Sequence, residues 1–273
     1  MHSTVSRQYR AKFPQVSRLK KILVNIICSF VPLKKTRKEI RQKLLSPKLK
    51  YDCILSLGHA CFMADALINA QLRKFSGPFD WVYGSSFEKR FAIFLDKFSH
   101  YLDKDDLVFS AAHTVNVPAA YQNTRTLLVH NHDFKNPDDF DSEYLAVAEK
   151  YTRRINRVLE NIQKAKHTLL VYAESKAESP GTSNAQLIEL VKLANETYEC
   201  PMDLLYMRHN SEFESGQFDW QEINENLFVV DYHALGGANA VPEENALIAQ
   251  SLGSILKKAA YEGVLLCPLP CDE

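Results

Sequence analysis

A short apolar run, a glycine and a helical pattern follow one another in the segment CILSLGHACFMADALINA, residues 53–70. The run from Cys53 to Leu57 is apolar apart from Ser56, which is typical of a strand that is covered on both faces. Gly58 permits a sharp exit from this strand, and the residues beyond it carry apolar side chains at helical spacing. This order predicts the first unit of a parallel sheet.

The rest of the body repeats this alternation of apolar runs and helical periodicity. The predicted strands are 53–57, 107–110, 126–130, 168–173, 204–207 and 227–231. Amphipathic helices are predicted over 144–162, 187–194 and 242–258. We therefore predict an α/β fold with a three-layer, doubly wound, mostly parallel sheet of the flavodoxin-like kind.

The charge of the chain is unevenly distributed, although its 33 basic and 33 acidic side chains balance. Residues 1–50 hold 14 Lys and Arg and a single acid, Glu39, which gives this segment a net charge of +13. Such an arm is expected to bind phosphate of lipid head groups, nucleic acid or an anionic substrate, unless it is a solvated tail. We predict two parts, a basic amphipathic arm over 1–50 and a single α/β domain over 51–273.

The centre of the arm is apolar from Ile22 to Val31. This run has about ten residues before Pro32, whereas a membrane span needs roughly 20. The apolar centre and its cationic flanks suit a helix in the interface of an anionic membrane, and a helix that packs on the body is the alternative. Nucleic acid is not expected as a partner, because the arm lacks interleaved aromatic residues. The segment resembles the leader of bacterial enzymes of surface-polysaccharide assembly.

The six cysteines favour a reducing compartment. They form no C-x-x-C pair and follow no secretory leader, so we expect free thiols in a cytoplasmic protein. The basic arm would make this protein peripheral at the inner face of the membrane. The cysteines do not have the spacing of metal ligands, so no metal is expected. No cofactor is expected either.

Ligands bind beyond the carboxyl ends of the strands in an open parallel sheet, so the residues that follow each strand form the candidate site. Segments 58–61, 131–134 and 231–233 lie at such positions. Cys61 is expected near the amino end of a helix, where backbone N–H groups and the helix dipole favour a thiolate. Cys61 is therefore the candidate nucleophile, and a buried structural cysteine is the alternative.

A thiol nucleophile needs a base, and the base needs a group that orients it. The candidates are His132 with Asp133, His233 with Asp231, and His59. Asn131, or the backbone N–H groups between Gly58 and Cys61, could hold an oxyanion. Each histidine could equally be a hydrogen-bonded loop residue without a catalytic role.

The segment SGPFDW, residues 76–81, is a turn that leads into bulky aromatic residues. It is either a buried corner or a wall of the substrate pocket, in which Asp80 and Trp81 would contact the substrate. Arg73 precedes this turn, and Arg153 lies on a predicted helix. Either arginine could grip a phosphate group in a glycosyl- or phosphotransferase, although a solvated helix face is the default for Arg153.

One set of motifs comprises Ser56-Leu57-Gly58 with Cys61, Leu72-Arg73, Ser76 to Trp81, His132-Asp133-Phe134, and Tyr151 with Arg153, Arg154, Ile155 and Arg157. In order and spacing this set resembles the bacterial family described as putative papain-like cysteine peptidases, from residue 51 to about residue 175. The resemblance implies Cys61 as nucleophile and His132 as its base. It also implies a papain-like α+β fold as the alternative to the α/β pattern.

A second set comprises the opening strand, Gly58, Cys61-Phe62, Ala64 and Pro78-Phe79. This set is similar to the GSCFA group of SGNH-type hydrolases, in which a serine follows the glycine. His59 stands there instead, so the resemblance implies the architecture and not the serine nucleophile. In that comparison Asn131 falls near the oxyanion-hole amide, and Asp231 and His233 fall near the terminal Asp and His.

We expect a cysteine-nucleophile hydrolase or acyl transferase of bacterial surface-polysaccharide metabolism, acting on a small-molecule, glycan or peptide substrate. In this hypothesis Cys61 attacks a carbonyl and a histidine carries the proton. The alternatives are a cysteine peptidase on a protein substrate, a membrane-associated glycosyl- or phosphotransferase, and a non-catalytic module of a polysaccharide assembly complex.

Overall fold

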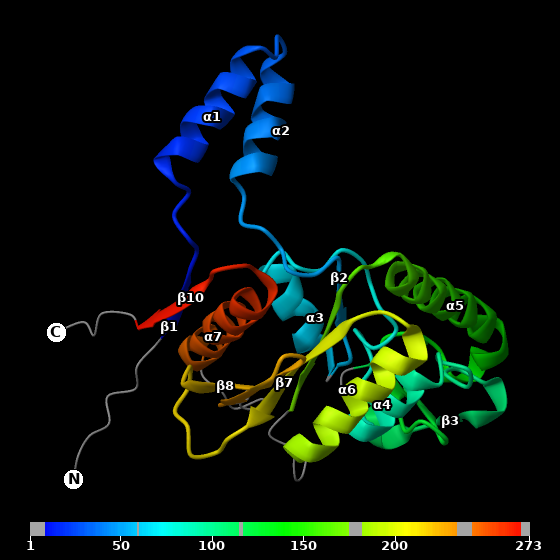
Figure 1. Cartoon of the computed structure of the whole chain (residues 1–273). Coiled ribbons are helices and arrows are strands. Elements are labelled where there is room, and N and C mark those ends of the chain that lie inside the picture. The colour runs from blue at the N-terminus through cyan, green and yellow to red at the C-terminus, as the bar shows by residue number, and fades with distance from the viewer. Residues whose placement is uncertain (1–8, 59, 115–116, 175–181, 234–241, 269–273) are drawn as a thin grey trace.

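The computed structural model describes residues 9–58, 60–114, 117–174, 182–233 and 242–268 (Figure 1). Its centre is a five-strand sheet in the order β2 (Cys53–Ser56), β6 (Thr168–Ala173), β7 (Met202–His209), β9 (Leu227–Tyr232) and β8 (Phe218–Asn224). The first four of these strands are parallel, and β8 pairs antiparallel with β9 at one edge. The four parallel strands lie at positions predicted from their apolar runs.

Helices cover both faces of this sheet (Figure 1). One face packs against α4 (Phe87–Leu95), α5 (Phe140–Lys164) and α6 (Asn184–Tyr198). The other face packs against α3 (Ala60–Asn69) and α7 (Pro242–Ala260). The predicted three-layer α/β fold with a mostly parallel sheet is therefore confirmed, and the sheet is not the antiparallel barrel of a papain-like domain.

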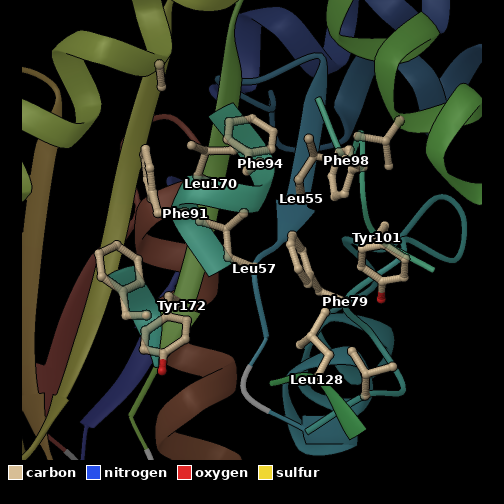
Figure 2. Close-up of a cluster of buried hydrophobic side chains, with 14 of the residues drawn as sticks. Leu55, Leu57, Phe79, Phe91, Phe94, Phe98, Tyr101, Leu128, Leu170 and Tyr172 are labelled. Atoms are coloured by element: carbon tan, nitrogen blue, oxygen red, sulfur yellow. The ribbon is translucent and has the colours of Figure 1, made fainter. Parts of the chain in front are cut away.

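Aromatic side chains dominate the core between β2 and α4 (Figure 2). Leu55 and Leu57 lie among Phe79, Phe91 and Phe94, all of which are almost completely buried. This packing holds the carboxyl end of β2 in place just before the chain turns into α3.

A separate antiparallel sheet is formed by β3 (Leu107–Phe109), β4 (Tyr121–Asn123) and β5 (Val129–His130). The prediction that 107–110 and 126–130 belong to the parallel sheet is therefore wrong. The reason is a local turn, in which Asn123 Oδ1 accepts hydrogen bonds from the backbone N–H groups of Arg125 (3.0 Å) and Thr126 (2.8 Å). This turn brings β5 back against β4, so both strands pair locally. Three short 3₁₀ helices occur in the described part of the body: η1 (Lys104–Asp106), η2 (Ala111–His113) and η3 (Pro137–Asp139).

The amino-terminal segment contains a strand and a helical hairpin. Strand β1 (Tyr9–Lys12) pairs antiparallel with β10 (Leu265–Pro268) near the other end of the chain. Helices α1 (Arg18–Ser29) and α2 (Lys34–Leu45) follow as a hairpin, after which Leu49 forms a bridge with Tyr261. Among the described helices, none combines the length and the apolar character that a membrane span requires.

Candidate functional site

Cys61 is the second residue of α3 and is partly exposed. It therefore lies in the first helical turn, where backbone N–H groups have no partner within the helix. The other three cysteines whose side chains are described, Cys28, Cys53 and Cys200, are buried, and all four are free thiols. His59, which precedes the helix, lies outside the described residues, so its predicted role has no structural account.

Gly58 makes the turn between β2 and α3. Its φ is +99°, and a Cβ atom added there would lie 2.2 Å from Nη1 of Arg90. The backbone N–H of Gly58 donates to Oγ of Ser56 (3.0 Å). Both the conformation and the close approach of Arg90 therefore require glycine.

Arg90 is fully buried in α4 and joins this turn to the segment before α4. Its guanidinium donates to the carbonyl oxygens of Leu57 (3.2 Å), Val82 (3.2 Å) and Gly84 (2.8 Å). Arg90 is not among the residues predicted from the sequence. The signal was its spacing, because it lies on the same helix face as the buried residues Phe87, Phe91 and Phe94.

Glu174 follows β6 at the same edge of the sheet and is also buried. Its carboxylate accepts hydrogen bonds from the Tyr206 hydroxyl (2.5 Å) and from the backbone N–H of His209 (3.0 Å). Glu174 is not among the predicted site residues, although it directly follows a predicted strand and could have been selected by that position. Because β6 is the neighbour of β2, Glu174 is the buried carboxylate on the strand next to the Cys61 turn.

His233 follows β9, and its Nδ1 lies 2.7 Å from the carbonyl oxygen of Phe213. The carbonyl can only accept, so Nδ1 carries the proton and donates it. Asp231 points elsewhere, with Oδ1 at 3.7 Å from Nη1 of Arg208 and Oδ2 accepting from Gln221 (3.2 Å). Burial raises the pKa of Asp231, and the charge of Arg208 opposes this.

The strand order sets the distance between the His233 and Cys61 segments. Strands β6 and β7 lie between β2 and β9, which places the ends of β2 and β9 about 14 Å apart at the usual strand spacing. His233 and Cys61 are therefore not neighbours along the sheet edge. Their side chains would have to reach across the ends of two strands to meet.

Segment 131–134 follows β5 of the small sheet and not a strand of the parallel sheet. His132 is exposed, whereas the Asp133 side chain is buried and faces His130. Nδ1 of His130 donates to Asp133 Oδ2 (3.1 Å), as does the Tyr151 hydroxyl (2.7 Å), and Lys150 pairs with the other carboxylate oxygen. The histidine that Asp133 orients is therefore His130, which the sequence analysis did not select.

The environment of Asp133 keeps it ionised. Burial alone would raise its pKa, but the hydrogen bond and charge of His130, together with Lys150, outweigh burial and hold the pKa far below its usual value. Nε2 of His130 has no hydrogen-bond partner among the described residues, and the imidazole ring packs edge-to-face with Tyr151, at 5.1 Å between ring centroids. Asn131 Oδ1 is likewise buried without a partner in the described part of the chain.

Comparison with known protein families gives a match for this chain. The family described as "Putative papain-like cysteine peptidase (DUF1796)" matches residues 52–199, which is more than half of the chain. The chain belongs to this family. Searches of curated proteins and of solved structures each found no match.

The papain-like family region runs from β2 to the end of α6. It includes Cys61, the His130–Asp133 pair and Glu174, whereas Asp231 and His233 lie beyond its end. The family name refers to papain, but the central sheet of this chain is mostly parallel.

The turn at 76–81 is one of the motifs within the family region. Arg73 donates to Asp80 Oδ2 (2.6 Å), and the Gly77 N–H donates to the same oxygen (2.7 Å). Burial raises the pKa of Asp80, and the hydrogen bond from Arg73 opposes this. The Arg73 guanidinium also lies over the ring of Trp81 at 5.4 Å. A cavity of about 20 Å³ beside the turn has room for about one water molecule.

One further predicted residue, Arg153, can be placed. Arg153 lies on the exposed face of α5, with Nη1 at 4.0 Å from Glu149. No group of three or more side chains suited to holding a metal ion occurs among the described residues.

Proposed function

We propose that the protein is a cysteine-dependent hydrolase or acyl transferase in which Cys61 is the nucleophile. The observation that carries the proposal is the place of Cys61, which is partly exposed in the first turn of α3, beyond the carboxyl end of β2. A thiolate at this place is stabilised by the backbone N–H groups and the dipole of the helix. Membership of the papain-like family supports a cysteine as the nucleophile.

The proposed reaction has two steps. The Cys61 sulfur forms a bond to a carbonyl carbon, and the resulting oxyanion lies near the N–H groups of the first turn of α3. The bond to the leaving alcohol or amine then breaks, and a histidine that has taken the thiol proton donates it to that group. Water, or an acceptor alcohol or amine, attacks the thioester and releases the Cys61 sulfur, with its own proton passing to the histidine.

We propose that the general base is one of three histidines, His59, His132 or His233. His132 is the histidine that the resemblance implies, and its exposed ring is reachable, although Asp133 orients His130 instead. His233 is oriented, because its Nδ1 donates to a backbone carbonyl and leaves Nε2 to accept a proton, but the ends of β6 and β7 lie between it and Cys61.

The proposed substrate is a small molecule, a glycan or a peptide with an ester, thioester or amide carbonyl. A peptidase acting on a protein would use the same residues. Glycosyl- or phosphotransfer has less support, because Arg73 is held by Asp80 and Arg153 is exposed beside Glu149. A role in bacterial surface-polysaccharide metabolism stays a prediction from the sequence.

The test is the rate at which iodoacetamide alkylates each cysteine of the folded protein at neutral pH, followed by mass spectrometry of peptides. We expect Cys61 to react at least about tenfold faster than Cys53, because a partly exposed thiol at a helix amino end forms a reachable thiolate. Cys53 is the matched internal control, since burial raises the pKa of its thiol to about 12. Replacing the true base by glutamine should slow the reaction of Cys61 and leave Cys53 unchanged.

Equal and slow alkylation of Cys61 and Cys53 would contradict the proposal that Cys61 is the nucleophile. Fast alkylation of Cys61 that none of the variants His59→Gln, His132→Gln and His233→Gln slows would contradict the choice of base. The melting temperature of each variant shows whether a slower reaction reflects lost folding.

A further inference from the structure

Helix α1 carries apolar side chains on two separate faces. Val24 and Cys28 are buried, and the Cys28 thiol faces the carbonyl oxygen of Arg37 in α2 at 3.7 Å. The second face is a stripe at helical spacing that we call the α1 stripe: Leu19 (80 % exposed), Ile22 (47 %), Leu23 (58 %), Ile26 (52 %), Ile27 (43 %) and Phe30 (81 %). One face therefore holds the hairpin together, and the other is left in solvent.

The α1 stripe does not pack on the body of the protein. Figure 1 shows the hairpin of α1 and α2, in blue, standing clear of the sheet and the helices that cover it. The expectation that the arm packs on the body as a helix is therefore not what the structure shows for α1. A contiguous exposed apolar surface of this kind is typical of an interaction site.

The charge around the stripe selects the chemistry of its partner. Residues 18–45 contain nine Lys and Arg and one acid, Glu39, and α2 contributes six of these cations. A second copy of this hairpin would bring two strongly positive surfaces together, which is unfavourable. An anionic lipid surface satisfies both features, because its head groups attract the cations and its acyl region accepts the apolar side chains.

The length of α1 decides how the helix would lie. Twelve residues extend about 18 Å, whereas the hydrocarbon core of a bilayer is about 30 Å thick. We propose that the α1 stripe docks on an anionic lipid bilayer with α1 lying parallel to the surface and the cations of α2 contacting the head groups. This inference is independent of the chemistry proposed for Cys61.

The experiment must leave both ends of the hairpin in place, because residues 9–12 pair with β10 and Leu49 bridges Tyr261. The full-length protein is sedimented with vesicles of phosphatidylcholine alone and of phosphatidylcholine with phosphatidylglycerol. We expect binding only to the vesicles that contain phosphatidylglycerol, and weaker binding as salt is raised.

Two sets of variants separate the apolar and the ionic contributions. Leu19→Ser with Leu23→Ser should lower the affinity for the anionic vesicles at least about tenfold, because less apolar surface enters the interface. Lys34→Gln with Lys35→Gln and Lys38→Gln should weaken binding and reduce its dependence on salt. The matched control is Leu145→Ser with Ile188→Ser, which changes exposed apolar residues of the body and should leave binding unchanged.

Equal sedimentation of the stripe variant and the unaltered protein would overturn the proposal, as would equal binding to both kinds of vesicle. Sedimentation velocity without lipid tests for a second copy as the occupant. A dimer that forms in the unaltered protein and is lost in the stripe variant would also overturn it, because the stripe would then bind another copy of this chain.

Discussion

Gly58 and Arg90 together determine how β2 leaves the sheet. Gly58 has a left-handed backbone conformation, and its hydrogen atoms face the Arg90 guanidinium where a Cβ atom would collide. Arg90 in turn donates to the carbonyl oxygens of Leu57, Val82 and Gly84. A change at Gly58 should therefore disturb several buried hydrogen bonds as well as one torsion angle.

We expect Gly58→Ala to lower the free energy of unfolding by about 2–4 kcal/mol, through backbone strain and lost hydrogen bonds of Arg90. The matched control is Gly253→Ala in α7, because a Cβ atom at Gly253 would meet nothing within 4 Å. That substitution should stabilise the protein by about 0.5–1 kcal/mol, since alanine favours a helix more than glycine does. Urea denaturation measures both, and changes of the same sign would contradict the account of Gly58.

Asp133 contacts His130, Lys150 and Tyr151, and its ionisation makes the free energy of unfolding depend on pH in the acidic range. Its pKa in the folded protein is far below the unfolded value of about 3.9, so its stabilising effect is present in full above that value. The effect is lost as the pH falls from there toward the folded pKa. Asp133→Asn should cost about 3–5 kcal/mol at neutral pH, because it leaves buried partners without a counter-charge.

The measurement is the free energy of unfolding between pH 7 and pH 3. The unaltered protein should lose more stability than Asp133→Asn over this range, because the variant has no carboxylate to protonate. Asp141→Asn is the control, since the Asp141 side chain is 84 % exposed in its pair with Lys104 and solvent screens that pair. Parallel curves for the unaltered protein and Asp133→Asn would show that Asp133 contributes no pH dependence.

Among the elements, the buried parallel strands were predictable and the edge strand was not. Strands such as β6, with six consecutive buried residues, appear in the sequence as continuous apolar runs. Strand β8 reads FDWQEIN and only its first residue, Phe218, is buried, so it has no such run. An apolar run also does not reveal its partner strand, which is why β3 and β5 were wrongly assigned to the parallel sheet.

The candidate site was predictable to a similar degree. The strand, glycine and helix pattern predicted that Cys61 would lie in the first turn of α3, because these are local features. Which of His130 and His132 faces the interior depends on the packing of Tyr101 and Tyr151 around His130, and the sequence carries no local signal for that. The catalytic roles of Cys61 and of the candidate histidines remain predictions.

In the whole molecule, two segments far apart in the sequence, β1 and β10, pair with each other. Phe13 adds an edge-to-face contact with Tyr261, at 5.2 Å between ring centroids. Removing residues 1–13 should lower the free energy of unfolding by about 1–3 kcal/mol, because the cross-strand pairs of β1 are lost. Removing residues 1–8 alone keeps these contacts and is the control. Equal melting temperatures for the two truncated proteins would contradict a stabilising role for β1.

The hairpin of α1 and α2 is joined to the body at both of its ends. Five residues separate β1 from α1, and the chain contacts the body again at Leu49. A domain joined through a single flexible linker can rotate in any direction, whereas two short connections restrict its rotation. On a surface that binds α1, these two connections restrict the orientations open to the body, and therefore those open to the β2–α3 turn that carries Cys61.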